Sequence, residues 1–312
     1  MIGPLLVDVD TGVDDAIALA FLVRRVPELL AVTTVAGNVP IDFSTPNTRN
    51  VVAWLGREDI PVHRGASRPL SVPYHDAAHV HGGNGLGNTT LPESPKPESA
   101  EHAVDAILRL AAEHEGELII LMLGPLTNLA IALSLRPALV DQIRKVVIMG
   151  GTYANPGNIT PHAEFNIYAD PHAAQQVFAA KWPQLVALGL DVTHQTVISR
   201  STWNAIPWDA SRPSQLARLI LARSYDERNL EGFYLHDPLA ALTVIDPEIV
   251  GVEHGRIEVT DEGDRRGQTT FTPGDGNHQV ATSVRASQAE QSICDALDVV
   301  WLPHDDVKDR AE

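Results

Sequence analysis

Residues 5–21 read LLVDVDTGVDDAIALAF, and this stretch decides the fold. The apolar run up to residue 9 is typical of a buried β-strand, and the run that follows is typical of an α-helix. Four of the eight residues from Asp8 to Asp15 are aspartates, with apolar residues on both sides. Carboxylates this close repel one another. We therefore expect a positive charge among them rather than a solvent-exposed acidic loop.

Strand-like and helix-like segments alternate through the first two thirds of the chain. The expected later strands are 29–37, 117–123, 144–151 and 183–193, and the helices between them are 44–56, 100–116, 124–135 and 170–182. The strands are apolar along their whole length, which indicates a mainly parallel sheet with helices on both faces. Ligands of such α/β proteins bind at the carboxyl edge of the sheet.

The last third of the sequence changes character. Residues 214–245 are expected to be helical with a loop near Gly232, and 254–284 to form antiparallel strands joined by Gly/Asp turns. Residues 285–302 predict a final helix. The expectation is one α/β domain over 1–312, an open mainly parallel sheet with a C-terminal antiparallel β appendage and a final helix.

Composition excludes several functional classes. The net charge of −17 disfavours nucleic acid as a partner, because phosphate binding needs a basic face. The single cysteine, Cys294, excludes an internal disulfide. No apolar run is long enough for a membrane span, and the N-terminus enters a strand without a signal-peptide pattern. We expect a soluble, cytoplasmic protein with no membrane partner.

The aspartate cluster is compatible with two kinds of site. Asp10 at a strand end and Asp15 in a helix could converge on one Ca²⁺ ion, which tolerates irregular oxygen ligation. An EF-hand is excluded, because Leu19 stands where the twelfth loop position needs an acidic residue. A haloacid-dehalogenase-like phosphatase with Asp8 as nucleophile is the alternative. Its usual Gly-Thr continuation is reversed here, and Lys145 is the only lysine near a strand start.

Further polar residues follow the predicted strands. Asn155, Asn158, Glu164 and Asn166 lie within one segment of twelve residues. Amides and a carboxylate that converge suit a polyhydroxylated ligand, although turn-forming residues in an ordinary loop give the same pattern. His236, followed by an aspartate before a helix, could donate a proton near neutral pH.

Seven ordered segments resemble the nucleoside hydrolase family. They are DVDTGVDDAIAL, TTVAGN, HGGNGLG, LGPLTNLA, IMGG, GNITPHAEFNIYADP and HDPLAA, and they span residues 5 to about 245. The first departs from the family signature at Val9, where Thr is usual, and at Thr11, where Pro is usual. Neither side chain is needed as a ligand, so the departures leave the predicted site intact.

The resemblance implies a ribonucleoside N-glycosidase with the open α/β nucleoside hydrolase fold, assembled as a homodimer or homotetramer. It implies one Ca²⁺ ion held by Asp10, Asp15, Asp237 and the backbone carbonyl of Thr127, with Asp10 as the general base and His236 facing the leaving base as its acid. The residues implied to surround the ribose and the base are Asp14, Asn38, His81, Met149, Asn158, Glu164, Phe165 and Asn166.

Two questions stay open at this stage. A non-catalytic nucleoside binder would keep the same pocket, although it would have no need for a water-activating carboxylate. His236 resembles the inosine–uridine-preferring branch of the family, and Arg223, Tyr225 and Arg228 are candidates for contacting the base. Trp203 and Trp208 are more typical of core or surface packing, so preference between purines and pyrimidines is not predicted.

Overall fold

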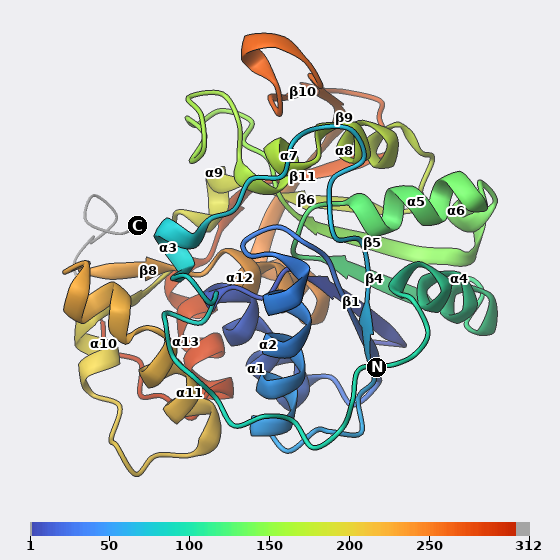
Figure 1. Cartoon of the computed structure of the whole chain (residues 1–312). Coiled ribbons are helices and arrows are strands. Elements are labelled where there is room, and N and C mark those ends of the chain that lie inside the picture. Colours follow the sequence, from blue (N-terminus) through green and yellow to red (C-terminus); the bar gives the residue numbers. More distant parts are fainter. Residues whose placement is uncertain (1, 304–312) are drawn as a thin grey trace.

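A computed structural model describes residues 2–303 of the chain. Its central feature is a nine-stranded sheet with the strand order β10-β9-β11-β6-β5-β4-β1-β2-β3 (Figure 1). The strands of this sheet are β1 (Leu5–Val9), β2 (Leu29–Thr34), β3 (Val62–Arg64), β4 (Leu118–Met122), β5 (Ile143–Met149), β6 (Leu185–Leu188), β9 (Val250–Val259), β10 (Thr269–Pro273) and β11 (His278–Val284). A separate antiparallel pair consists of β7 (Val197–Ser199) and β8 (Gly232–Tyr234).

The strand directions confirm the predicted fold class. Strands β6, β5, β4, β1, β2 and β3 are all parallel. Strand β11 is parallel to β6 and antiparallel to β9, and β10 is antiparallel to β9. The C-terminal antiparallel strands therefore continue the main sheet, since His278 of β11 pairs with Leu185 of β6.

Helices connect the strands and cover the sheet. In chain order they are α1 (Val13–Arg25), α2 (Ile41–Trp54), α3 (Ala78–His81), α4 (Ala103–Glu113), α5 (Thr127–Leu135), α6 (Leu139–Gln142), α7 (Phe165–Ala169), α8 (Pro171–Ala179), α9 (Leu190–Thr193), α10 (Arg200–Asn204), α11 (Arg212–Ile220), α12 (His236–Ile245) and α13 (Ala286–Ala296). Single turns of π-helix and 3₁₀-helix occur at 223–227, 247–249 and 263–265.

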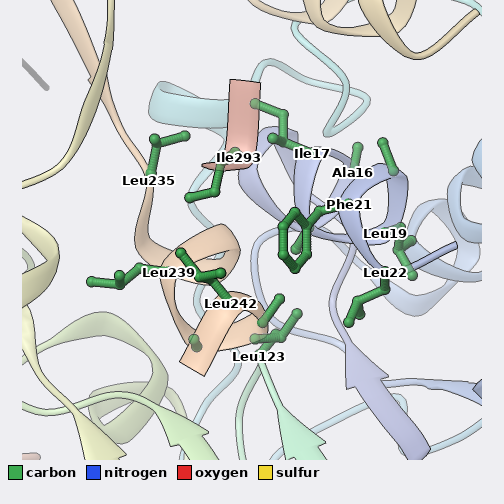
Figure 2. Packing of buried hydrophobic residues seen from close by; sticks show 14 of the residues in the cluster. Ala16, Ile17, Leu19, Phe21, Leu22, Leu123, Leu235, Leu239, Leu242 and Ile293 are labelled. Atoms are coloured by element: carbon green, nitrogen blue, oxygen red, sulfur yellow. The ribbon is translucent and has the colours of Figure 1, made fainter. Parts of the chain in front are cut away.

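Both faces of the sheet are buried, which is why the strands are apolar throughout. Val7 of β1 belongs to the core under α1, α12 and α13, and its neighbour Leu6 belongs to the core under α4, α5 and α8. Figure 2 shows Phe21 of α1 beside Leu239 and Leu242 of α12. Alternation of side chains across a strand thus gives apolar neighbours on both sides.

Two predicted segments differ from the structure in detail. The strand expected over 183–193 ends at Leu188, and a short helix, α9, follows it. The segment 214–245 contains α11, a π-helical turn, β8 and α12 rather than helix alone. Strand β8 depends on pairing with β7, where Phe233 lies opposite Ile198. Such a long-range pairing leaves no local pattern in the sequence.

Two smaller observations concern the helices. Cys294 is buried in α13. None of the helices between residues 2 and 303 is both long enough and apolar enough to span a bilayer.

Candidate functional site

The site lies at the carboxyl edge of the parallel strands, where several loops converge. Asp10 follows β1, Asn38 lies in the loop after β2, and Leu123 follows β4. Met149 is the last residue of β5. Asn38, Leu123 and Met149 line a cavity of about 210 Å³. This is the edge at which the sequence predicted a ligand site.

Most of the predicted site residues lie on this cavity. Those that line it are Asp14, Asn38, His81, Met149, Asn158, Glu164, Phe165, Asn166, His236 and Asp237. Asp10 and Asp15 are fully buried beside it, each hydrogen-bonded to the side chain of Asn38. The structure therefore brings together residues from five separate segments of the chain.

Four aspartates converge at one end of the cavity. Carboxylate oxygens of Asp14, Asp15 and Asp237 lie within 4.8 Å of one another. The side-chain amide of Asn38 donates to Asp10 Oδ1 and to Asp15 Oδ2, at 3.1 Å in each case. These contacts make Asp10 part of the same cluster.

Asp15 links the cluster to the start of helix α1. Its carboxylate accepts hydrogen bonds from the backbone N–H groups of Gly12 (2.9 Å) and Asp10 (3.2 Å). The Gly12 N–H is free because the first N–H groups of a helix have no partner within the helix, and the Asp10 N–H lies just before the helix. The Asp15 side chain therefore stabilises the start of α1 and ties the cluster to the end of β1.

The electrostatics of the cluster favour a bound cation. Burial raises the pKa of Asp15 to about 6. Burial and repulsion from neighbouring carboxylates raise the pKa values of Asp10 and Asp237 well above their usual range. A cation paired with several carboxylates removes this penalty. The donors are all oxygens, which hard ions such as Ca²⁺, Mg²⁺ and Mn²⁺ prefer, so the cluster could hold a metal ion.

Thr127 does not lie on the cavity. It is the first residue of α5, where its hydroxyl donates to Asp170 Oδ2 at 2.7 Å and its carbonyl points along the helix. Leu123, four residues earlier, does line the cavity, and its carbonyl accepts a hydrogen bond from Asn166 Nδ2 at 2.7 Å. Both carbonyls follow β4, so sequence position alone did not distinguish them.

A wall of polar side chains faces the aspartates. The Asn166 amide donates to the carbonyls of Leu123 (2.7 Å) and Met149 (3.2 Å), which fixes the orientation of its oxygen. Glu164 accepts backbone hydrogen bonds from Gly151 and Asn166, and burial raises its pKa to about 7. Oriented amide and carboxylate oxygens of this kind are acceptors for ligand hydroxyl groups.

Imidazole rings also line the cavity, and His81 lies beside the aspartates: its Nδ1 is 3.8 Å from Asp14 Oδ1 and accepts a hydrogen bond from the backbone N–H of Val13. His236 Nδ1 lies 2.7 Å from the Thr193 hydroxyl, and the ring centroids of His236 and His194 are 5.4 Å apart. Burial lowers the pKa of His236 well below its usual range and the pKa of His81 to about 3. Both rings are therefore neutral at pH 7, and each can offer one N–H donor.

Some lining residues had not been selected from the sequence. They are Ala77, His79, Val80, Leu123, Ile159, His194 and Arg228, of which Arg228 was a candidate for contacting the base. Of these residues, His194 has the side chain best suited to hydrogen bonding or proton transfer. It follows β6 and α9, so the rule that ligands bind where parallel strands end could have found it.

The structure also separates the candidates for contacting the base. Arg228 lines the cavity, whereas Arg223 donates to the carbonyl of Val80 at 2.8 Å. Tyr225 is fully buried, with its hydroxyl bonded to the carbonyl of Ile198. The two tryptophans considered, one buried and one exposed, lie off the cavity.

Asp8 is in the wrong place for a phosphatase nucleophile. It is fully buried outside the cavity lining, and its Oδ1 accepts hydrogen bonds from Thr33 and Asn128. A substrate phosphate in the cavity could not reach it. Of the four N-terminal aspartates, Asp10, Asp14 and Asp15, which follow β1, belong to the site, whereas Asp8, within β1, does not.

Comparison with known proteins agrees with this geometry. Residues 5–297 match the family model described as inosine-uridine preferring nucleoside hydrolase. The chain belongs to the inosine-uridine preferring nucleoside hydrolase family. It is thus an N-glycosidase, and the sequence resemblance is confirmed.

Individual relatives cover most of the chain. An inosine-uridine preferring nucleoside hydrolase of Leishmania major is 37% identical over 262 residues, which cover 82% of each chain. Uridine nucleosidase 1 of Arabidopsis thaliana is 34% identical, with 86% of this chain and 82% of the relative covered. The solved structure of a purine-preferring ribonucleoside hydrolase from Gardnerella vaginalis superposes with a TM-score of 0.88 at 30% identity, covering 94% of this chain and 98% of that one. Nucleoside hydrolases named for different bases therefore share this fold.

Proposed function

We propose that this nucleoside hydrolase converts ribonucleosides to ribose and free base, using a water molecule activated at the aspartate cluster. The observation that carries the proposal is the arrangement of one cavity. Buried carboxylates, oriented amides and imidazole rings all lie at this one cavity. A ribonucleoside has matching parts, namely a polyhydroxylated sugar and a flat heterocycle that is the leaving group.

The metal in this proposal is a single Ca²⁺ ion. Its ligands are the carboxylates of Asp10, Asp15 and Asp237, together with a backbone carbonyl after β4. Leu123 replaces Thr127 as the candidate for that carbonyl, because Leu123 lines the cavity. A bound divalent cation supplies Lewis acidity, which lowers the pKa of water and orients ligand oxygens.

Asp10 is the general base of the proposed reaction. Its carboxylate is held by the backbone N–H of Asn38 at 2.7 Å and by the Asn38 side chain. It accepts a proton from the attacking water as the oxygen forms its bond to the anomeric carbon. The base leaves with the electron pair of the glycosidic bond.

The remaining polar residues bind the sugar. Asp14, Asn38, Asn158, Glu164 and Asn166 hold the ribose hydroxyls, and Met149 and Phe165 pack around the ring. Cleavage of the glycosidic bond develops positive charge on the sugar, as in other glycoside hydrolysis. Buried carboxylates beside the sugar stabilise that charge more in the transition state than in the ground state.

The base lies beside His236 in this proposal. His236 donates a hydrogen bond to the departing heterocycle, and His81 lies at the same cavity near the sugar. The hydrogen bond strengthens as electrons move onto the base, so it lowers the barrier to bond cleavage.

The test is a product analysis with inosine, uridine, cytidine and adenosine. We expect equal amounts of free ribose and free base from at least one of them, whether or not inorganic phosphate is present. Ribose 1-phosphate formed only with phosphate would contradict hydrolysis. Binding of all four nucleosides without any cleavage would identify a non-catalytic binder instead.

A further inference from the structure

His236 is held by one hydrogen bond from a neighbouring helix. Its Nδ1 lies 2.7 Å from the Oγ1 of Thr193, the last residue of α9, and His236 itself begins α12. The rings of His194 and Tyr234 lie 5.4 Å and 5.5 Å from its own, centroid to centroid. The neighbouring rings restrict the position of the imidazole, and Thr193 contacts its Nδ1.

The direction of this hydrogen bond follows from the surroundings of Thr193. Two buried helical threonines donate to the carbonyl four residues earlier: Thr48 to Ser44, and Thr243 to Leu239. Within residues 2–303, the Thr193 hydroxyl has no such carbonyl partner, and its one hydrogen bond joins it to His236 Nδ1. Thr193 is fully buried, so solvent cannot replace that acceptor.

We propose that Thr193 is a positioning residue that donates its hydroxyl proton to Nδ1 of His236 and thereby keeps the imidazole hydrogen on Nε2, facing the leaving base. The inference rests on the proposed hydrolysis of ribonucleosides and assigns a further residue to it. A neutral imidazole carries one hydrogen, so a donor at Nδ1 determines which nitrogen holds it.

The tautomer decides whether His236 helps or hinders the departure of the base. With hydrogen on Nε2, the ring donates to a heterocycle that gains the electron pair of the breaking C–N bond. With hydrogen on Nδ1, a lone pair of Nε2 would face the electron-rich base. Water supplies the oxygen for the sugar, Asp10 takes the proton of that water, and the departed base gains its proton from solvent.

A substrate whose leaving group needs no hydrogen bond can distinguish a positioning role of Thr193 from a purely structural one. p-Nitrophenyl β-D-ribofuranoside releases a stable phenolate, so a hydrogen bond to the leaving group contributes little to its hydrolysis. Any damage to the aspartate cluster or to the ribose wall would slow this substrate as much as uridine or inosine. The comparison of both substrates therefore isolates the leaving-group end of the cavity.

The experiment uses Thr193→Val, Thr193→Ser and the matched control Thr243→Val. A hydrogen bond to charge that develops in the transition state contributes about 10²–10³-fold to kcat, so we expect Thr193→Val, which weakens that bond, to lower kcat for the best natural nucleoside by at least about tenfold. Its rate on the nitrophenyl riboside should stay within about threefold of wild type. Thr193→Ser keeps the hydroxyl and should restore most of the nucleoside activity. Thr243→Val removes a buried hydroxyl from the helix that carries His236 and should leave both rates near wild type.

Several outcomes would overturn the assignment. Equal loss on both substrates in Thr193→Val would mean a structural role, and no loss on either would mean no role. A wild-type protein that cleaves neither substrate would refute the proposed function itself, which distinguishes the two failures. ¹⁵N NMR of the wild-type protein adds a test that needs no variant: His236 Nδ1 should give the signal of a nitrogen without hydrogen, and a protonated Nδ1 would overturn the proposal.

Discussion

The carboxylate of Asp10 occupies the space that a side chain at position 37 would need. A Cβ atom built on Gly37 would lie 2.0 Å from Asp10 Oδ2, and one on Gly124 would lie 3.0 Å from Asp10 Cγ. Two loops, after β2 and after β4, thus approach Asp10 through glycines. This close approach lets the backbone N–H of Asn38 reach Asp10 Oδ2 at 2.7 Å.

The first prediction concerns Gly37→Ala. The added methyl group must displace Asp10 or the loop, and a displacement of about 1 Å in a catalytic site can reduce the rate about 10²-fold. We expect a loss of kcat/KM of that size for ribonucleosides. The matched control is Gly83→Ala, where the nearest atom to a new Cβ is 3.9 Å away. Equal activity of both variants would contradict the tight packing at Asp10.

The second prediction compares Asp10→Asn with Asp8→Asn. Both residues are fully buried, but only Asp10 is bonded to Asn38 at the cavity. Asp10→Asn should lower kcat by about 10²–10⁴-fold because the general base is lost. Asp8→Asn should keep most of the activity, since an amide oxygen can still accept the hydrogen bond from Asn128. The reverse order of effects would support Asp8 as the reactive carboxylate.

How much of this site can be predicted from the sequence depends on how far apart in the chain its contacting residues lie. The first strand, the helix that follows it and the aspartates between them were all predicted, because strand period, helix start and charge clustering are local patterns. Asp237 joins Asp15 across more than two hundred residues, and only the family resemblance connected them. Contacts between distant loops depend on the packing of α1 against α12, which no local pattern encodes.

Two features of the site could not be predicted from the sequence. Thr127 and Leu123 both follow β4; the helix expected over 124–135 begins at Thr127, and only the folded structure shows that Leu123 lines the cavity. His194 directly follows the strand expected over 183–193, but the chain turns into α9 after Leu188 and brings the His194 ring beside His236. In both cases the boundary between strand and helix decided which atom reaches the cavity.

The third prediction concerns the loop that carries Asn158. The carboxylate of Asp191 accepts backbone hydrogen bonds from Tyr153, Ala154 and Asn155, at 2.8, 2.8 and 2.9 Å. Asp191→Ala leaves these donors without their charged acceptor, so the loop should hold the sugar less well. We expect a roughly tenfold higher KM, which corresponds to about 1.4 kcal/mol. Steady-state kinetics should place Asp191→Asn between wild type and Asp191→Ala, and an unchanged KM in Asp191→Ala would refute this role.

The fourth prediction follows from the raised pKa values of the cluster. The pKa of Asp15 rises from 3.8 to about 6. A carboxyl group with a raised pKa in the folded state contributes stability that is present below pH 3.8 and lost as the pH rises through 6. Asp10 and Asp237 shift in the same direction. Calcium, which binds the ionised groups, should offset that loss, so the rise in Tm on adding Ca²⁺ should be larger at pH 7 than at pH 5.

Thermal unfolding with and without Ca²⁺ at the two pH values measures this difference directly. The buried histidines titrate in the opposite sense, but they contribute to both samples at each pH and cancel in the comparison. The Asp10→Asn variant should show a smaller rise in Tm at pH 7, because one ligand charge is gone. A rise that is equal at both pH values would mean that calcium does not bind the ionised cluster.

The most direct test of the central claim is the rate of ribose release from the best nucleoside by protein stripped of metal with a strong chelator. The carboxylates around Asp10 are proposed to share one Ca²⁺ ion that the reaction requires. We expect almost no ribose without added metal and a saturable return of activity as Ca²⁺ is titrated back. Full activity in the continued presence of the chelator would contradict the account.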